Sequence, residues 1–396
     1  MTELVLLLVV VVTALAFDFT NGFHDTANAM ATSIATKALK PRTAVALAAV
    51  LNLVGAFLSV QVALTVTNDI LRIQDDDGAP VEGLAGVPIL EILLAGLVGA
   101  ILWNLATWLF GLPSSSSHAM FGGLIGAALV AIGTSGVKWD GVVEDIVIPA
   151  FVAPFVAMVV AAAAIWCVLR IVASVPRGTR EQGFRWGQIG TASLVALSHG
   201  TNDAQKTMGV ITLALIGYGS WTDLEAIPVW VKISCALAIA SGTYLGGWRV
   251  IRTMGKGLVE LTPPQGMAAE ASSAAIILTS SHLGMALSTT QVATGSIMGT
   301  GLGTRGSTVR WSLAGRMAAA WIITLPAAGL TGAGCWLLMT AIGGVAGVLV
   351  VFGLLVVLSG AVWARAQRAK VDPANVNEDW DGELAPASAR PEGGRP

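Results

Sequence analysis

A short polar motif occurs twice in this chain, each time inside a stretch that is otherwise apolar enough to cross a membrane. The first copy is NGFHD at residues 21–25, and the second is HGTND at residues 199–203. Their aspartates, Asp25 and Asp203, lie 178 residues apart (203 − 25). A carboxylate at membrane depth is costly and typically marks an ion or substrate pathway. Two of them in matching positions predict a transporter built from internal repeats.

The composition indicates a membrane protein. Hydrophobic residues make up 55% of the chain, charged residues only 12%, and the mean hydropathy is +0.75. Several stretches exceed the roughly 18–20 apolar residues that a membrane-crossing helix needs. Full spans are expected at 4–34, 43–66, 147–172, 189–216, 228–247, 313–338 and 342–363, with the first and fourth interrupted at their motifs. Membrane lipid is the expected surrounding. No basic stripe with interleaved aromatic residues indicates a nucleic-acid partner.

Lysine and arginine gather in alternate connections and so orient the chain. Basic connections face the cytoplasm, which places the N-terminus outside and the C-terminus inside. Two further apolar regions, 88–133 and 270–302, each contain a polar break. The loops that flank the first region are both acidic, and those that flank the second are both basic. Each region is therefore expected to enter and leave on one face, as a hairpin, and the two hairpins enter from opposite faces.

The expected fold is an all-α polytopic membrane protein with two inverted-topology repeats, each with a broken helix and a re-entrant helical hairpin. The polar end of the chain, rich in Pro, Gly, Asp and Glu, is expected to be disordered. The predicted division is a first repeat at 1–173, a cytoplasmic linker at 174–188, a second repeat at 189–340, a final transmembrane helix at 341–364 and a disordered cytoplasmic tail at 365–396.

The tips of the two hairpins carry matching hydroxyl groups. The first tip reads GLPSSSSH at 111–118, and the second reads GMALSTTQ at 284–291. An offset of 173 residues aligns the two tips and also the glycines that follow them (288 − 115). The helix after each tip presents free N–H groups and the positive end of its dipole. Together with Ser and Thr hydroxyls, these groups form an anion site suited to a tetrahedral oxyanion.

These motifs resemble the inorganic phosphate transporter family, the PiT permeases, and the resemblance covers the chain to about residue 363. It rests on residues 22–28, 111–118, 198–206 and 288–291. The resemblance implies a secondary active transporter that imports inorganic phosphate in the plasma membrane. His24 and residues 203–206 look like the bacterial branch, which implies proton symport and phosphate carried as a neutral complex with Mg²⁺ or another divalent cation. Sodium coupling is the alternative.

The resemblance also assigns roles to individual residues. Those expected to bind phosphate are Ser115, Ser116, Ser117, Ser288, Thr289, Thr290, Lys206 and Asn28. Those expected to couple transport to protons or cations are Asp25, Asp203, Asn21, Asn202, His24 and His199. No prosthetic group is expected, and the ligands of a metal are left unassigned. The second tip departs from the family pattern, because Leu287 and Gln291 stand where the family usually has Pro and His.

Other functions stay open at this point. A sulfate or other oxyanion permease of the same architecture is the nearest alternative, because Ser and Thr tips do not by themselves recognise phosphorus. A passive anion channel would show no accumulation against the gradient. An intramembrane hydrolase using Ser117 and His118 is disfavoured, since the serines are duplicated together with their Asp partners and no Gly-x-Ser-x-Gly elbow is present. Assembly as a homodimer also stays open.

Overall fold

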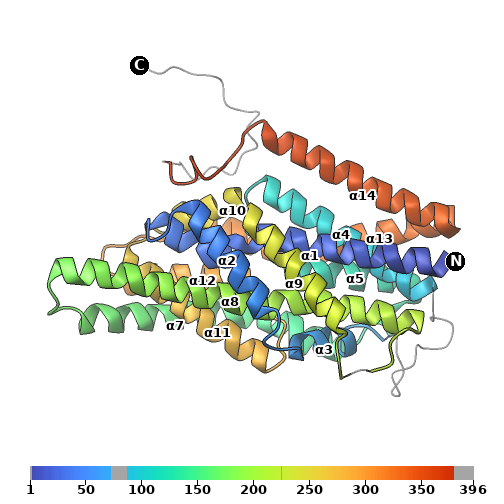
Figure 1. Cartoon of the computed structure of the whole chain (residues 1–396), viewed down its shortest axis with the longest axis horizontal. Coiled ribbons are helices and arrows are strands. Elements are labelled where there is room, and N and C mark those ends of the chain that lie inside the picture. The colour runs from blue at the N-terminus through green and yellow to red at the C-terminus, as the bar shows by residue number, and fades with distance from the viewer. Residues whose placement is uncertain (1, 73–86, 224, 379–396) are drawn as a thin grey trace.

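The computed structural model describes residues 2–72, 87–223 and 225–378, and its regular elements are all helices (Figure 1). In chain order they are α1 (Thr2–Ala35), α2 (Pro41–Gly55), α3 (Gln61–Asn68), α4 (Val87–Leu109), α5 (Ser116–Ile132), η1 (Thr134–Gly136), α6 (Trp139–Gly141), η2 (Val142–Val147), α7 (Ile148–Ile171), α8 (Arg177–Tyr218), α9 (Val229–Leu245), α10 (Trp248–Arg252), η3 (Thr253–Gly257), α11 (Pro263–His282), α12 (Thr289–Gly303), α13 (Trp311–Ile342) and α14 (Gly344–Gln367).

The described residues confirm an all-helical chain with membrane-length apolar helices. Five helices are long and apolar enough to cross a membrane, and a bent pair, 229–245 with 248–257, would make a sixth. The predicted span at 43–66 is wrong in one respect, because α2 and α3 are separate helices with a break at 56–60. Figure 1 shows the long helices running roughly side by side along the molecule, with α14 at its edge.

The expected breaks in the first and fourth spans are absent. Both α1 and α8 continue through their motifs as single helices, so the prediction of broken helices is wrong. The motif glycines serve packing instead. A Cβ added to Gly22 would lie 2.3 Å from the Ile239 carbonyl oxygen, and one on Gly200 would lie 2.2 Å from that of Asn52. Glycine is needed at both positions because another backbone comes this close.

The two predicted polar breaks in 88–133 and 270–302 are present. One separates α4 from α5, and the other separates α11 from α12. Gly111 and Gly284 begin the two connections with φ of 67° and 78°, a backbone conformation that favours glycine. Ser115 and Ser288 then act as N-caps, and their hydroxyls accept from the N–H groups of His118 and Gln291. The polar tips are therefore built as the sequence indicates.

The helix after each tip packs on a long helix from the other half of the chain. On α5, a Cβ at Gly126 would lie 2.1 Å from the Gly329 carbonyl oxygen of α13. On α12, a Cβ at Gly299 would lie 2.1 Å from the Met158 carbonyl oxygen of α7. The offset between the two glycines, 173 residues (299 − 126), is the offset between the tips. The two tip helices are thus held in place by equivalent backbone contacts.

The beginning of the predicted disordered tail is ordered. The last helix, α14, extends to Gln367, and the segment after it folds back on the protein. Val376 is buried, and Asn377 donates a hydrogen bond of 3.1 Å to the Ile34 carbonyl oxygen of α1. The prediction is therefore wrong for 365–378, whose short apolar and polar contacts fix it to α1. Residues 379–396 lie outside the described part of the chain.

Candidate functional site

The two motifs and the two tips meet in the interior of the helical bundle. All the residues expected in the site are buried: Asn21, His24, Asp25, Asn28, Ser115, Ser116, Ser117, His199, Asn202, Asp203, Lys206, Ser288, Thr289 and Thr290. They come from α1, α8 and the starts of α5 and α12. The structure thus brings together segments that lie up to 269 residues apart in sequence (290 − 21).

Two polar side chains of the motif helices, Lys206 and Asn28, form hydrogen bonds with the tips. On α8, the Lys206 ammonium donates to the Ser117 hydroxyl at 2.6 Å and to the Leu287 carbonyl oxygen at 2.9 Å. On α1, Asn28 Nδ2 lies 3.2 Å from Thr289 Oγ1 and 3.0 Å from Thr290 Oγ1. Asn28 and Lys206 are separated by the same 178 residues as the two aspartates (206 − 28). Each of these equivalent residues therefore holds a tip of the opposite half.

Asp203 is compensated from three sides. Lys206, one helical turn away, forms an ion pair with its carboxylate and donates a hydrogen bond to it. The Thr289 hydroxyl donates to the same carboxylate at 3.0 Å, and His199 Nε2 lies 2.8 Å from it. A buried carboxylate with a cation and hydroxyl donors avoids the large cost of an isolated charge. Asp203 thereby links α8 to the second tip and, through Lys206, to the first.

Asp25 has a different surrounding. His24 Nδ1 lies 2.5 Å from its carboxylate, and His24 Nε2 lies 3.4 Å from the hydroxyls of Thr107 and Ser114. No lysine or arginine pairs with Asp25 among the ion pairs of the described residues. The two aspartates of the repeated motif are therefore not equivalent, because both lie beside a histidine but only Asp203 also pairs with a lysine.

Three of these side chains form a group of the size of a cation site. One ligand atom from each of Asp25, His199 and Asp203 can be chosen so that all three lie within 4.8 Å of one another. Two amide oxygens of the motifs, Asn21 Oδ1 and Asn202 Oδ1, are buried without a hydrogen-bond partner. Carboxylate and amide oxygens are ligands for hard cations such as Mg²⁺. The donor set therefore suits a small cation.

The tip hydroxyls divide into three kinds. Ser115 and Ser288 accept the N-cap hydrogen bonds of their helices. Ser117, Thr289 and Thr290 are engaged with Lys206, Asp203 and Asn28. Ser116 Oγ is buried with no partner. Buried polar atoms are normally satisfied, so Ser116 is available to a bound anion without breaking any contact in the protein.

Comparison with known proteins agrees with this geometry. The family model described as "Phosphate transporter family" matches residues 21–332, which include both motifs and both tips. This chain belongs to the phosphate transporter family. It is a membrane transporter and not an enzyme.

Several relatives match most of the length of this family member. A "Probable low-affinity inorganic phosphate transporter" of Mycobacterium tuberculosis (strain ATCC 25618 / H37Rv) is 58% identical over 383 residues, covering 96% of this chain and 89% of the relative. A protein of the same name from Bacillus subtilis (strain 168) is 43% identical over 330 residues, covering 83% of this chain and 96% of the relative. A solved structure named "The sodium-dependent phosphate transporter" shares the fold, with a TM-score of 0.71 at 23% identity, over 86% of this chain and 100% of that chain.

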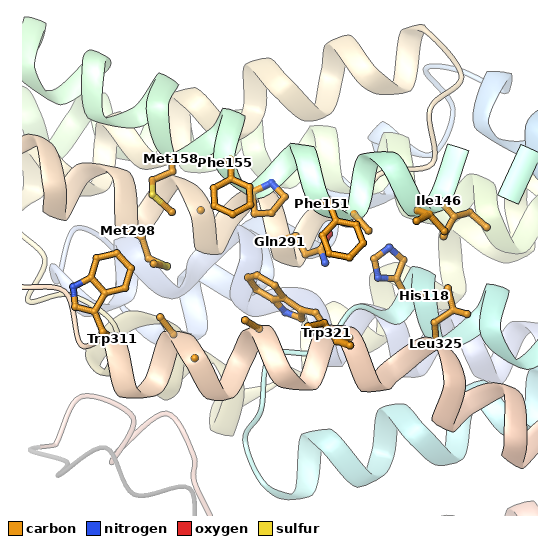
Figure 2. A pocket seen from close by; sticks show the side chains of 18 residues that line it. His118, Ile146, Phe151, Phe155, Met158, Gln291, Met298, Trp311, Trp321 and Leu325 are labelled. Carbon is orange, nitrogen blue, oxygen red and sulfur yellow. The ribbon is translucent and has the colours of Figure 1, made fainter. Parts of the chain in front are cut away.

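Beside the site, this phosphate transporter family member has an apolar cavity of about 510 Å³. Figure 2 shows His118 and Gln291, the last residues of the two tips, facing this cavity between aromatic side chains such as Phe151 and Trp321. The cavity lies between α7 and α13, the helices on which the tip helices pack.

Several polar residues near the site are not evident from the sequence motifs. Thr107 contacts His24 beside Ser114 of the first tip, and Asn52 lies between His199 and Thr243. Asp18 on α1 is fully buried seven residues before Asp25. Of these residues, Asp18 alone gives a signal in the sequence, as a charged residue inside the first apolar span.

A second buried carboxylate lies outside the central group. Glu270 on α11 accepts hydrogen bonds from Thr32, from Thr191 at 2.7 Å and from Gln188 Nε2 at 3.4 Å. It therefore ties α1 and α8 to α11. Its position in an apolar region of the sequence is the signal that could have identified it.

Proposed function

We propose that this chain imports inorganic phosphate by proton symport in the plasma membrane, with its N-terminus outside and its C-terminus in the cytoplasm. The observation that carries the proposal is the pair of crossed contacts, Lys206 to Ser117 and Asn28 to Thr290, beside two buried carboxylates. One anion placed between these groups would contact donors from both tips. Membership of the phosphate transporter family makes phosphate the anion of choice.

The anion would be held mainly by neutral donors. The first-turn N–H groups of α5 and α12 and the positive ends of these helices point to the region where the tips meet. The tip hydroxyls and the amide of Asn28 add hydrogen bonds, and the Lys206 ammonium adds a positive charge. The proposed phosphate ligands are Ser115, Ser116, Ser117, Ser288, Thr289, Thr290, Asn28 and Lys206.

The carboxylates supply the coupling. Two like charges about 4 Å apart repel by roughly 4 kcal/mol at an effective dielectric constant near 20. Lys206 offsets the charge of Asp203, but Asp25 has only His24 and His199 near it. Phosphate is therefore expected to bind well only when a proton or a cation neutralises Asp25. Asp25, Asp203, His24, His199, Asn21 and Asn202 form the proposed coupling set.

The same oxygen-rich group would accept a divalent cation that travels with the phosphate. Mg²⁺ prefers carboxylate and other oxygen ligands and retains water molecules and phosphate oxygens in its shell. Asp25 and Asp203 supply carboxylate oxygens within one small space. A neutral complex of metal and phosphate would cross the membrane interior at a lower electrostatic cost than free phosphate. The metal is then part of the cargo.

Two inverted-topology repeats are the proposed basis of alternating access. The equivalent contacts of Gly126 with Gly329 and of Gly299 with Met158 support this architecture. In this proposal the repeats comprise 1–173 and 189–340, the hairpins are re-entrant, and the motif helices are continuous. Rocking of one tip-bearing unit against the other would open the site to each side in turn.

Sodium-coupled phosphate symport is the second candidate. It is favoured by the name of the solved structure that shares this fold, which describes a sodium-dependent transporter. Amide and carboxylate oxygens such as those of Asn21, Asn202 and Asp25 also suit Na⁺. Sulfate transport by the same architecture is distinguished by competition, because fully ionised sulfate has no proton to share with a carboxylate whereas phosphate near neutral pH does.

The deciding experiment measures uptake of radiolabelled phosphate into sodium-free proteoliposomes containing Mg²⁺, under an imposed inward proton gradient. Accumulation above equilibrium that collapses when the gradient is dissipated would establish proton-coupled transport. Uptake that appears only with sodium would overturn the proton coupling in favour of sodium. Equal inhibition by sulfate and by unlabelled phosphate would contradict selectivity for phosphate.

A further inference from the structure

Asp18 is a buried carboxylate without a hydrogen-bond partner. Its residue is 0% exposed, and neither Oδ1 nor Oδ2 has a partner among the described residues. It lies on α1 seven residues, or about two helical turns, before Asp25, and so on the same helix face. An isolated ionised carboxylate in an apolar interior is far more costly than a neutral one. The geometry of Asp18 therefore favours the protonated acid.

The neighbours of Asp18 agree with a neutral side chain. From α8, the Thr207 hydroxyl faces it, and this hydroxyl is itself buried without a partner. A protonated carboxyl group has one O–H to donate, and a hydroxyl oxygen can accept it. The charged or titratable groups that act on Asp18 are Asp203 and Lys206 of α8 and the Cys235 thiol of α9.

Lys206 is the cation among the charged groups that act on Asp18, and its ammonium is already hydrogen-bonded elsewhere. An ammonium group has three N–H donors. Lys206 directs hydrogen bonds to the Asp203 carboxylate, the Ser117 hydroxyl and the Leu287 carbonyl oxygen, which account for all three. Asp18 and Asp203 thus lie near a single ammonium group that is fully engaged by Asp203 and the tips. A buried carboxylate that is not paired with this cation must be neutralised in another way.

We propose that Asp18 is a proton-binding residue of the transport cycle: it holds a proton while Lys206 is paired with Asp203, and releases it when Lys206 leaves Asp203. Release leaves a carboxylate at Asp18 and a proton in water, and the freed ammonium then compensates Asp18. Asp203 becomes available to the coupling cation in the same step. Because Lys206 also contacts both tips, a movement of either tip would change which carboxylate carries the proton.

This inference rests on the proposed proton symport and adds to it a residue outside the phosphate ligands. On the orientation given by the charge pattern, Asp18 lies on the outer side of Asp25, since α1 begins outside. A proton bound at Asp18 would therefore lie between the external medium and the carboxylates of the motif. Val10, Ala14 and Phe17 are buried on this part of α1, and Asp18 is the charged residue type among them.

The test compares Asp18→Asn with the wild-type protein in three measurements on reconstituted full-length chains. Infrared spectra report the C=O stretch of protonated carboxylic acids, proton-driven uptake reports accumulation, and phosphate exchange at equal pH on both sides reports movement of the anion alone. We expect D18N to lose one protonated-acid band and all accumulation above equilibrium. Phosphate exchange should persist in this variant and lose its pH dependence, because the asparagine amide resembles the protonated carboxylic acid of Asp18. Glu91→Gln is the matched control, since it removes a partly buried acid of α4 that is outside the site.

The outcomes separate this inference from the proposed function. An unchanged infrared band in D18N, or undiminished accumulation, would overturn the role of Asp18. Loss of exchange as well as accumulation would also overturn it, because the residue would then support substrate binding or folding. Asp18→Glu keeps a titratable group and should retain accumulation, which guards against a misfolded D18N protein. A wild-type protein that accumulates phosphate only with sodium would refute proton symport itself, whatever the spectra of D18N show.

Discussion

The Lys206 ammonium lies 2.6 Å from the Ser117 hydroxyl, although the two residues are 89 positions apart and belong to opposite halves of the chain. Lys206 also pairs with Asp203 on its own helix. A single side chain therefore connects Ser117 of the first tip to Asp203, the carboxylate of the second motif, which in turn accepts from Thr289 of the second tip. A substitution in either tip or at Asp203 is therefore expected to change the contacts that Lys206 makes with the others.

Lys206→Met should both destabilise the protein and abolish phosphate uptake. Removing one partner of a buried ion pair leaves an uncompensated charge and typically costs about 3–5 kcal/mol. Thermal unfolding in detergent measures the loss of stability, and proteoliposome uptake measures transport. The double variant Lys206→Met with Asp203→Asn should regain most of the stability and none of the uptake. A double variant as unstable as the single one would contradict the pairing.

Asp203→Asn alone should abolish coupled phosphate uptake. The amide keeps the shape of the carboxylate and can still accept from Thr289, but it can no longer bind a proton or compensate Lys206. Uptake driven by a proton gradient is the measurement, with Asp223→Asn in an exposed connection as the control. Near-normal accumulation by Asp203→Asn would refute the coupling role of the second motif.

Asn28→Ala should weaken the apparent affinity for phosphate more than it lowers stability. It removes two hydrogen bonds to the second tip, each worth about 0.5–1.5 kcal/mol. The apparent KM for phosphate should therefore rise by roughly tenfold, since about 1.4 kcal/mol corresponds to that factor. Ser135→Ala is a suitable control, because this exposed hydroxyl bonds only to the Ile132 carbonyl oxygen. An unchanged KM would show that the hold on the second tip does not affect the site.

Gly126→Ala and Gly299→Ala should destabilise the protein to a similar extent. Each new methyl group would meet a backbone carbonyl oxygen at 2.1 Å, so two helices must move apart. Overpacking of this kind typically costs about 1–3 kcal/mol. Gly353→Ala on α14 is the control, because a Cβ there meets nothing within 4 Å. Melting temperatures of the purified variants would check this, and a marked difference between the two would contradict equivalent packing.

The sequence predicts the all-helical class and selects polar residues that the structure buries together, because polar residues in apolar spans are few and repeated. It fails where the reason for a residue lies in another helix. The polar motifs suggested breaks in α1 and α8, yet both helices are continuous, and Gly22 and Gly200 are required by the backbones of α9 and α2. The spacing of a motif within one helix carries no information about such a neighbour.

The surroundings of the two aspartates can be read from the motifs only in part. Lys206 follows Asp203 by one helical turn, and Asn28 stands at the equivalent place after Asp25, but the contacts of Lys206 with the two tips appear only in the packed structure. The motif comparison does not point to Asp18 either. It has no counterpart in the second half, where Ala196 stands at the same offset of 178 residues (18 + 178), so a search for duplicated features does not detect it.

The glycine contacts of the tip helices mean that each half of the chain is incomplete as a folding unit. Cut off from the rest, residues 1–173 would leave the glycine-lined face of α5 without α13, and the C-terminal half would leave α12 without α7. After the first half is inserted into the membrane, α5 therefore lacks its packing partner α13 until that helix is synthesised. The packing of both tip helices can therefore be completed only after α13 has emerged from the ribosome.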